Sequence, residues 1–204
     1  MKLYVLPGAC SLASHIALHW AGSDAEMVVL SRSDLQGDYT RINPKASVPA
    51  LLLDDGTVLT ESLAVLLYIA DTHPAAQLGA TDVLARARLN EALAELVSDV
   101  NTAWAPFFSP ARFVASEAHY DEAKQAAAKQ IDKQYRRLDG IMQGRDWRVL
   151  GRRTVADAYL YIMCTWKDKS PQKLAEYPAL AAFRARLDQD TGVQKALAME
   201  AVYQ

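Results

Sequence analysis

The sequence changes its periodicity after His73 and Pro74, and that change limits the folds open to the chain. Before it, short apolar runs bounded by turn residues predict strands, whereas residues 82–204 carry helical periodicity and no convincing strand. A chain of 204 residues is long enough for two small domains. We therefore expect an α/β domain over residues 1–75, a linker over 76–81 and an all-helical domain over 82–204.

The first domain is predicted to be a strand–helix–strand unit followed by a hairpin and a helix, which together give one mixed sheet. Asp54-Asp55-Gly56 between two apolar runs is a strong hairpin signal. Ser31 to Ser47 is polar and is expected to be a loop with one irregular helical turn. The expected elements are, in order, a strand at 3–6, a helix from Cys10-Ser11 to Gly22, strands at 27–30, 49–53 and 57–60, and a helix at 62–72.

In the second domain, alanine-rich segments at 84–100 and 117–142 predict two long helices. Thr154 and Asp157 have the spacing of a capping box, in which two side chains satisfy the first backbone donors of a helix. A helix is therefore expected to begin there, followed by two shorter ones marked by Tyr177-Pro178 and Thr191-Gly192.

Composition excludes several classes of function. The formal net charge is -2 and basic residues do not cluster, which argues against nucleic-acid binding. The two cysteines, Cys10 and Cys164, lack metal-site spacing, so we expect neither a zinc site nor a disulfide, and a reducing compartment. The apolar run before Pro7 is too short for a signal peptide, and no run is long enough to span a membrane. A cytosolic protein is predicted.

Cys10 and Ser11 follow a strand and open a helix, a position that can support sulfur chemistry. The positive end of a helix stabilises a thiolate, and the Ser11 hydroxyl could donate to the sulfur of a bound thiol. The alternative is structural, with Cys10 as a small buried side chain and Ser11 as a helix cap. The residues alone leave both open.

Two further segments could bind a peptide-like ligand. Pro49 enters a strand and is plausibly cis, which would leave the backbone of Val48 free to pair with an extended peptide. Glu61 and Ser62 open a helix after a strand, where backbone N–H groups bind carboxylates and Glu61 could take an ammonium group. An ordinary edge-strand proline and simple helix capping are the alternatives.

The segments PGACSLASHIAL, NPKASVPALLLDDGTVLTES and TVADAYLY, taken together, resemble the bacterial beta class of cytosolic glutathione transferases. The resemblance covers nearly the whole chain. It implies a thioredoxin-like N-terminal domain, a helical C-terminal domain, a homodimer, and glutathione as co-substrate without a metal.

Carried over residue by residue, the resemblance assigns Cys10 and Ser11 to the catalytic position. It implies that Val48 pairs with the tripeptide backbone beside cis-Pro49, and that Glu61 and Ser62 hold the γ-glutamyl end. It also implies that Arg32 contacts the glycyl carboxylate, and that Thr154 and Asp157 form the helix cap on which folding of the second domain depends.

The sequence departs from the class at one place that lines the active site. Asn101 and Thr102 stand where the class usually carries a His-Lys pair, and an asparagine that reaches the partner subunit's glutathione is missing near Ala94. A cation and a titratable imidazole are thereby absent. The aromatic side chains Trp104, Phe107, Phe108 and Trp166 could form the apolar half of the cleft or simply belong to the core.

Three functions follow as hypotheses. The first is conjugation of the glutathione thiol to a small, apolar electrophile, with a role in detoxification. The second is glutathione-dependent thiol–disulfide exchange through Cys10. The third is a non-enzymatic glutathione-binding or regulatory protein, because the same fold can serve different functions.

Overall fold

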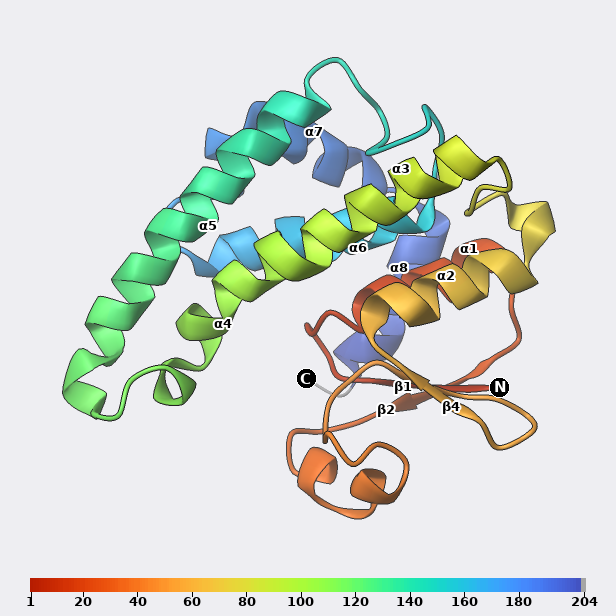
Figure 1. Ribbon diagram of the computed structural model, residues 1–204, viewed down its shortest axis with the longest axis horizontal. Coiled ribbons are helices and arrows are strands. Elements are labelled where there is room, and N and C mark those ends of the chain that lie inside the picture. Colours follow the sequence, from red (N-terminus) through yellow and green to blue (C-terminus); the bar gives the residue numbers. More distant parts are fainter. Residues whose placement is uncertain (203–204) are drawn as a thin grey trace.

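The computed structural model describes residues 1–202, and its N-terminal part is built on a four-stranded mixed sheet (Figure 1). The strands lie in the order β2-β1-β3-β4, with β1 parallel to β2 and antiparallel to β3, and β3 antiparallel to β4. The predicted strand–helix–strand unit and hairpin are thereby confirmed. The elements are β1 (Lys2–Val5), α1 (Leu12–Ala21), β2 (Glu26–Val29), β3 (Ala50–Leu52), β4 (Val58–Thr60) and α2 (Ser62–Thr72).

The two faces of the sheet bury different layers because side chains alternate along a strand. Leu3 and Val5 of β1 are fully buried in the main core, which they share with α1 and α2. Tyr4 belongs to a smaller cluster with Tyr39, their ring centroids 5.3 Å apart. Tyr39 lies in the loop that was expected to hold one irregular turn. The loop instead holds two 3-10 helices, η1 (Asp34–Gln36) and η2 (Asp38–Arg41).

Helices make up the rest of the described chain, and no strand occurs between residues 61 and 202. Their arrangement places the long α5 at one end of the molecule, away from the sheet (Figure 1). None of the helices among residues 1–202 has the length and apolar character needed to cross a bilayer. The α-helices of this part are α3 (Val83–Ala94), α4 (Thr102–Phe108), α5 (Tyr120–Met142), α6 (Val155–Trp166), α7 (Pro178–Leu187) and α8 (Thr191–Ala201).

The helix predicted over 84–100 extends further than expected. After α3 the chain widens into a π-helical segment, η4 (Glu95–Asn101), and continues without a break as α4 to Phe108. Pro106 lies inside α4, where it removes one backbone donor without ending the helix. Wide turns of this kind occur frequently at functional sites, and this one ends at Asn101.

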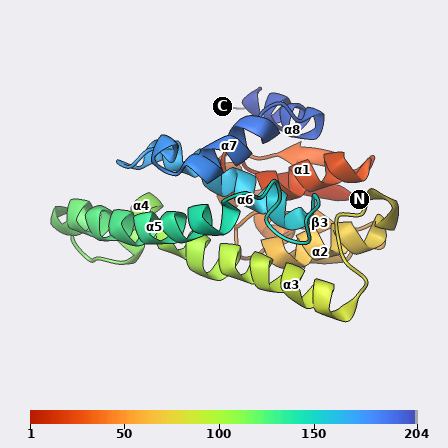
Figure 2. The same ribbon diagram turned by 90° about the horizontal axis from the view of Figure 1, so that it is seen from above.

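Helix α6 forms the centre of the helical part. Every residue of α6 except Thr165 is buried, which is the pattern of a core helix. Seen from above, α6 lies between α3 and α7, and it also packs against α1 (Figure 2). The predicted capping box opens it, with Thr154 N donating to Asp157 Oδ2 at 2.8 Å. A buried helix beginning at a fixed cap gives Tyr159, in its second turn, a defined position.

Candidate active site

The Cys10 thiol lies in the loop between β1 and α1 and faces the segment that precedes β3. Cys10 is partly buried, and its Sγ donates to the Val48 carbonyl oxygen at 3.5 Å. The peptide bond between Val48 and Pro49 is cis, as predicted. Val48 stays outside the sheet ladder because β3 begins at Ala50. Two of the predicted segments therefore meet at the sulfur of Cys10.

Ser11 takes part in the same loop, with its hydroxyl turned toward the backbone of β1. Its Oγ accepts from Leu6 N at 3.0 Å and lies 3.4 Å from Leu6 O, and the side chain is fully buried. Ser11 occupies the N-cap position of α1 but makes no side-chain cap hydrogen bond. In this conformation the hydroxyl shapes the loop, and the role predicted for it at a ligand's sulfur stays a prediction.

The acidity of Cys10 differs from the sequence-based expectation. Burial raises the pKa of the Cys10 thiol, while hydrogen bonds from the Ser62 side chain and from the backbone N–H groups of Cys10 and Ser11 oppose it. The lowered pKa expected from a helix N-terminus alone is therefore wrong in its net direction. The reason is that desolvation of an anion outweighs the donors that surround it.

Glu61 and Ser62 lie at the start of α2, directly after β4. Ser62, the first residue of α2, is buried, and its side chain lies close enough to Cys10 to lower the pKa of the thiol. Glu61 is exposed, adopts a positive φ of 69° and pairs with Lys45 Nζ at 2.6 Å. Lys45 was not singled out from the sequence, although it lies in the same segment as Val48.

Two side chains from the helical part complete this cluster and were missed as site residues. Tyr159 of α6 is fully buried, and its hydroxyl lies in side-chain hydrogen-bonding reach of Ser62 and Cys10. Asn101 Nδ2 donates to the Tyr159 hydroxyl at 3.0 Å. Burial strongly raises the pKa of Tyr159 and keeps it a neutral phenol. The available signal was a phenol on an apolar helix face, because a buried hydroxyl needs a partner.

The aromatic side chains flagged in the sequence gather beside this cluster. Trp104 is fully buried, whereas Phe108 is 42% exposed and stacks on it with ring centroids 5.1 Å apart. Trp166 meets Phe108 edge-on, also at 5.1 Å. Arg32 is exposed in the loop after β2, and its contact with a glycyl carboxylate stays a prediction. Phe108 is thus the exposed member of the group.

The loop that carries Cys10 is hydrogen-bonded to α8, the last helix described. Gly8 N donates to Glu200 Oε2 at 3.2 Å, and the other carboxylate oxygen of Glu200 lies 3.2 Å from His15 Nδ1. Trp166 Nε1 donates to Gly8 O at 2.9 Å. His15 is fully buried in this contact.

The fold and this cluster are those of a two-domain, glutathione-dependent class of proteins, and comparison with known families agrees. Residues 8–72 match the model of the glutathione S-transferase N-terminal domain, and residues 99–200 match that of the C-terminal domain. The chain belongs to the glutathione S-transferase family.

Bacterial glutathione S-transferases are among the relatives that match nearly the whole chain. The chain is 37% identical over 202 residues to glutathione S-transferase GST-4.5 of Xanthomonas campestris pv. campestris, covering 98% of both chains. A sphingomonad glutathione S-transferase complexed with glutathione is 40% identical, with a TM-score of 0.90 and coverage of 98% and 99%. The beta-class enzyme of Sphingomonas chungbukensis is 37% identical, with a TM-score of 0.89 and 98% of both chains covered. The resemblance to the beta class is confirmed.

Proposed function

We propose that this chain is a transferase that joins the sulfur of glutathione to small, apolar electrophiles. The observation that carries the proposal is the meeting of Cys10, Val48 and Ser62, which come from three separate segments, at one sulfur atom. Relatives that span nearly the whole chain are glutathione S-transferases, which favours conjugation over thiol–disulfide exchange and over a non-enzymatic role.

In this proposal the tripeptide lies along the cleft edge of the sheet. The Val48 backbone pairs with the cysteinyl residue of glutathione, as in the addition of a strand, with cis-Pro49 beside it. The N-terminus of α2 and the Ser62 hydroxyl hold the γ-glutamyl carboxylate. The Glu61 carboxylate pairs with the ammonium group. It is then shared between that group and Lys45, which pairs with Glu61 in the free protein. Arg32 is proposed for the glycyl carboxylate.

The proposed chemistry is nucleophilic attack by a bound thiolate. The glutathione thiol gives its proton to solvent, its sulfur forms a bond to the electrophilic carbon, and the leaving group departs with the electron pair of the bond that breaks. Binding contributes by holding the two reactants in line, which replaces a collision in solution. Cys10 lies at the position where the incoming sulfur must sit, and Ser11 supports the loop that places it.

The electrophile is proposed to bind on the apolar side of the cleft, toward Phe108. A hollow of about 650 Å³ adjoins the Cys10 loop, and its lining includes Pro7, Gly8, Trp166 and Lys169. Lys169 Nζ lies 5.5 Å from the centre of the Phe108 ring. The lining of this hollow also includes Arg184, Asp188 and Glu200, so the apolar surface proposed for the electrophile is the exposed side chain of Phe108 next to it.

We also propose that the protein is a homodimer. Val83 and Leu84, at the start of α3, are 85% and 67% exposed, which is costly for adjacent apolar side chains on a monomer. Sedimentation equilibrium should give twice the chain mass, and the double variant Val83→Asp, Leu84→Asp should give a monomer. A monomeric wild type would overturn this part of the proposal.

The first test is glutathione binding by calorimetry, followed in the same sample by turnover with an aryl halide electrophile. Micromolar-to-millimolar binding with turnover supports the transferase. Cys10→Ala should alter conjugation, whereas the matched Cys164→Ala, at a fully buried position in α6, should not. Binding without turnover would favour thiol–disulfide exchange, which an intact-mass search for a glutathione adduct on Cys10 would detect. Absence of binding would overturn the proposal.

A further inference from the structure

A tyrosine from the helical part lies against the sulfur of the sheet domain. Tyr159 is in the middle of α6 with no exposed surface, and its hydroxyl is in side-chain hydrogen-bonding reach of Cys10 and Ser62. Because its ring is packed on all sides, the hydroxyl has little freedom to turn elsewhere. Two hydroxyl groups, from α2 and from α6, therefore converge on Cys10.

Asn101 determines which way the phenolic proton can point. Its Nδ2, a donor only, gives a hydrogen bond to the Tyr159 oxygen at 3.0 Å. The oxygen acts as acceptor in that contact, so the tyrosine's own proton must find another partner. Ser62 and Cys10 are the groups in its reach. A buried hydroxyl proton without an acceptor would be costly.

The Cys10 sulfur needs different neighbours in its two protonation states. As a thiol it donates to the Val48 carbonyl oxygen at 3.5 Å. As a thiolate it has no proton to give, and it requires donors. Glu61, at the start of α2, is a charged group that acts on Cys10, and it opposes ionisation. Stabilisation of the anion must come from neutral donors, of which the Ser62 and Tyr159 hydroxyls are two.

We propose that Asn101 and Tyr159 form a relay that presents a hydroxyl proton to the Cys10 sulfur and, with Ser62, stabilises its anionic form. Tyr159 is the donor to the sulfur, and Asn101 is a positioning residue that acts through Tyr159. This inference deepens the proposed function, on which its catalytic meaning rests. The property itself belongs to the protein without ligand and can be measured there.

The test is the pH dependence of Cys10 alkylation by iodoacetamide, because only the thiolate reacts. Rates would be followed by intact mass on the full-length protein without glutathione, with peptide mapping to show that the adduct is on Cys10. In Tyr159→Phe, which keeps the ring and removes the donor, the midpoint pH should rise by about 1 to 2. In Asn101→Leu it should rise by a smaller amount, because the hydroxyl remains but is no longer oriented.

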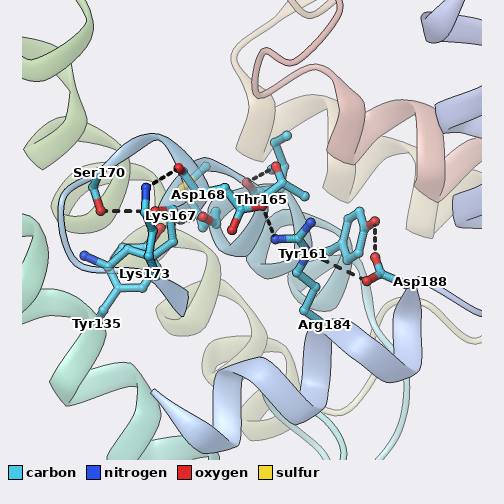
Figure 3. A network of polar contacts seen from close by, with 11 residues as sticks. Tyr135, Tyr161, Thr165, Lys167, Asp168, Ser170, Lys173, Arg184 and Asp188 are labelled. Carbon is cyan, nitrogen blue, oxygen red and sulfur yellow. Dashed lines mark hydrogen bonds and ion pairs between the residues drawn. The ribbon is translucent and has the colours of Figure 1, made fainter. Parts of the chain in front are cut away.

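The matched control is Tyr161→Phe, two residues further along the same helix. Tyr161 is also buried, but its hydroxyl donates to Asp188 Oδ1 at 2.7 Å (Figure 3). Its midpoint should equal that of the wild type. Near-ultraviolet circular dichroism and the melting temperature of each variant would show that the fold is kept.

An unchanged or lower midpoint in Tyr159→Phe would overturn the relay, and so would an equal rise in Tyr161→Phe. If Asn101→Leu leaves the midpoint unchanged while Tyr159→Phe raises it, the positioning role of Asn101 is overturned and the tyrosine donor stands. The proposed function fails separately, through calorimetry, because wild-type protein that binds no glutathione would still give an alkylation profile.

Discussion

At the scale of single residues, the variant Ser11→Ala tests whether the Ser11 hydroxyl stabilises the loop that carries Cys10. Ser11→Ala removes the acceptor of Leu6 N in a fully buried setting, and an unpaired buried donor is costly. We expect the free energy of unfolding to fall by about 1–2 kcal/mol, measured by urea denaturation.

Ser14→Ala is the matched control for this loss. Ser14 is equally buried in α1, and among residues 1–202 its hydroxyl has no hydrogen-bond partner. Stability should therefore be kept or slightly improved. If Ser11→Ala leaves stability unchanged but lowers conjugation, the hydroxyl acts on the bound thiol as the sequence suggested, and its structural role is wrong.

Glu61 combines the carboxylate proposed to bind the ammonium group of glutathione with an unfavourable backbone conformation, since a φ of 69° suits glycine far better than glutamate. Glu61→Gly and Glu61→Ala both remove the carboxylate, but only glycine relieves the backbone. The glycine variant should be the more stable of the two by about 1 kcal/mol, measured by thermal denaturation. Both should lose glutathione affinity to the same degree. Equal stability would show that the conformation carries no cost.

The sequence marked residues in both halves of this cluster but did not show how the two halves meet. Cys10, Val48 and Ser62 each lie where a strand or loop meets a turn or helix start, so local chemistry marks them. Tyr159 lies in the segment TVADAYLY and Asn101 at the position compared with the His-Lys pair, but the two are 58 positions apart and no local pattern pairs them. Their meeting depends on how α6 packs beside the π-helical segment, which no short-range pattern encodes.

At the scale of elements, strands and helix starts were predictable, and helix ends were less so. Hairpin residues and the Thr154–Asp157 cap carry specific local chemistry, and they fixed β3, β4 and the start of α6. The prediction that this helix ends at Val100 was wrong, because η4 and α4 continue the helical segment to Phe108. Burial of Trp104 against α5 and α6 stabilises that extension, and burial is a tertiary effect.

Gly192 is a point of close approach between α8 and α1. A Cβ at this position would lie 2.6 Å from Trp20 Cδ1, and the Trp20 ring is held by a hydrogen bond from its Nε1 to Asp190. Gly192→Ala should therefore destabilise the protein by about 1–3 kcal/mol through overpacking, measured by urea denaturation.

Gly140→Ala provides the opposite case within α5. A Cβ there meets nothing within 4 Å, so the variant should gain up to about 1 kcal/mol from helix propensity. Destabilisation of both variants by similar amounts would show that the contact with Trp20 is not the cause.

At the scale of the whole molecule, a buried lysine makes stability depend on alkaline pH. Lys167 has no exposed surface, and its Nζ lies 4.9 Å from the ring centres of both Tyr135 and Tyr177 (Figure 3 shows it beside Tyr135). Among residues 1–202 that nitrogen has no hydrogen-bond partner. Burial lowers the pKa of Lys167 from 10.5 to about 8.

The unfolded chain therefore binds more protons than the folded one between about pH 8 and 10.5, so this group makes the folded state more stable as pH rises through that window. The full difference is roughly 3 kcal/mol. Lys167→Met should remove this contribution while keeping the volume. The check is the difference in unfolding free energy between wild type and variant, measured from pH 7 to 10. A difference that stays constant over this range would contradict the assignment.

The contact between Gly8 and Glu200 joins residues 192 positions apart at the back of the cysteine loop. During synthesis the loop leaves the ribosome before its carboxylate partner, which follows only after helices α1 to α7 have been made. A nascent chain therefore carries Cys10 on an unfinished loop. A proteolytic cut that releases α8 would remove the same contact from a folded molecule and leave the backbone N–H of Gly8 without its carboxylate acceptor.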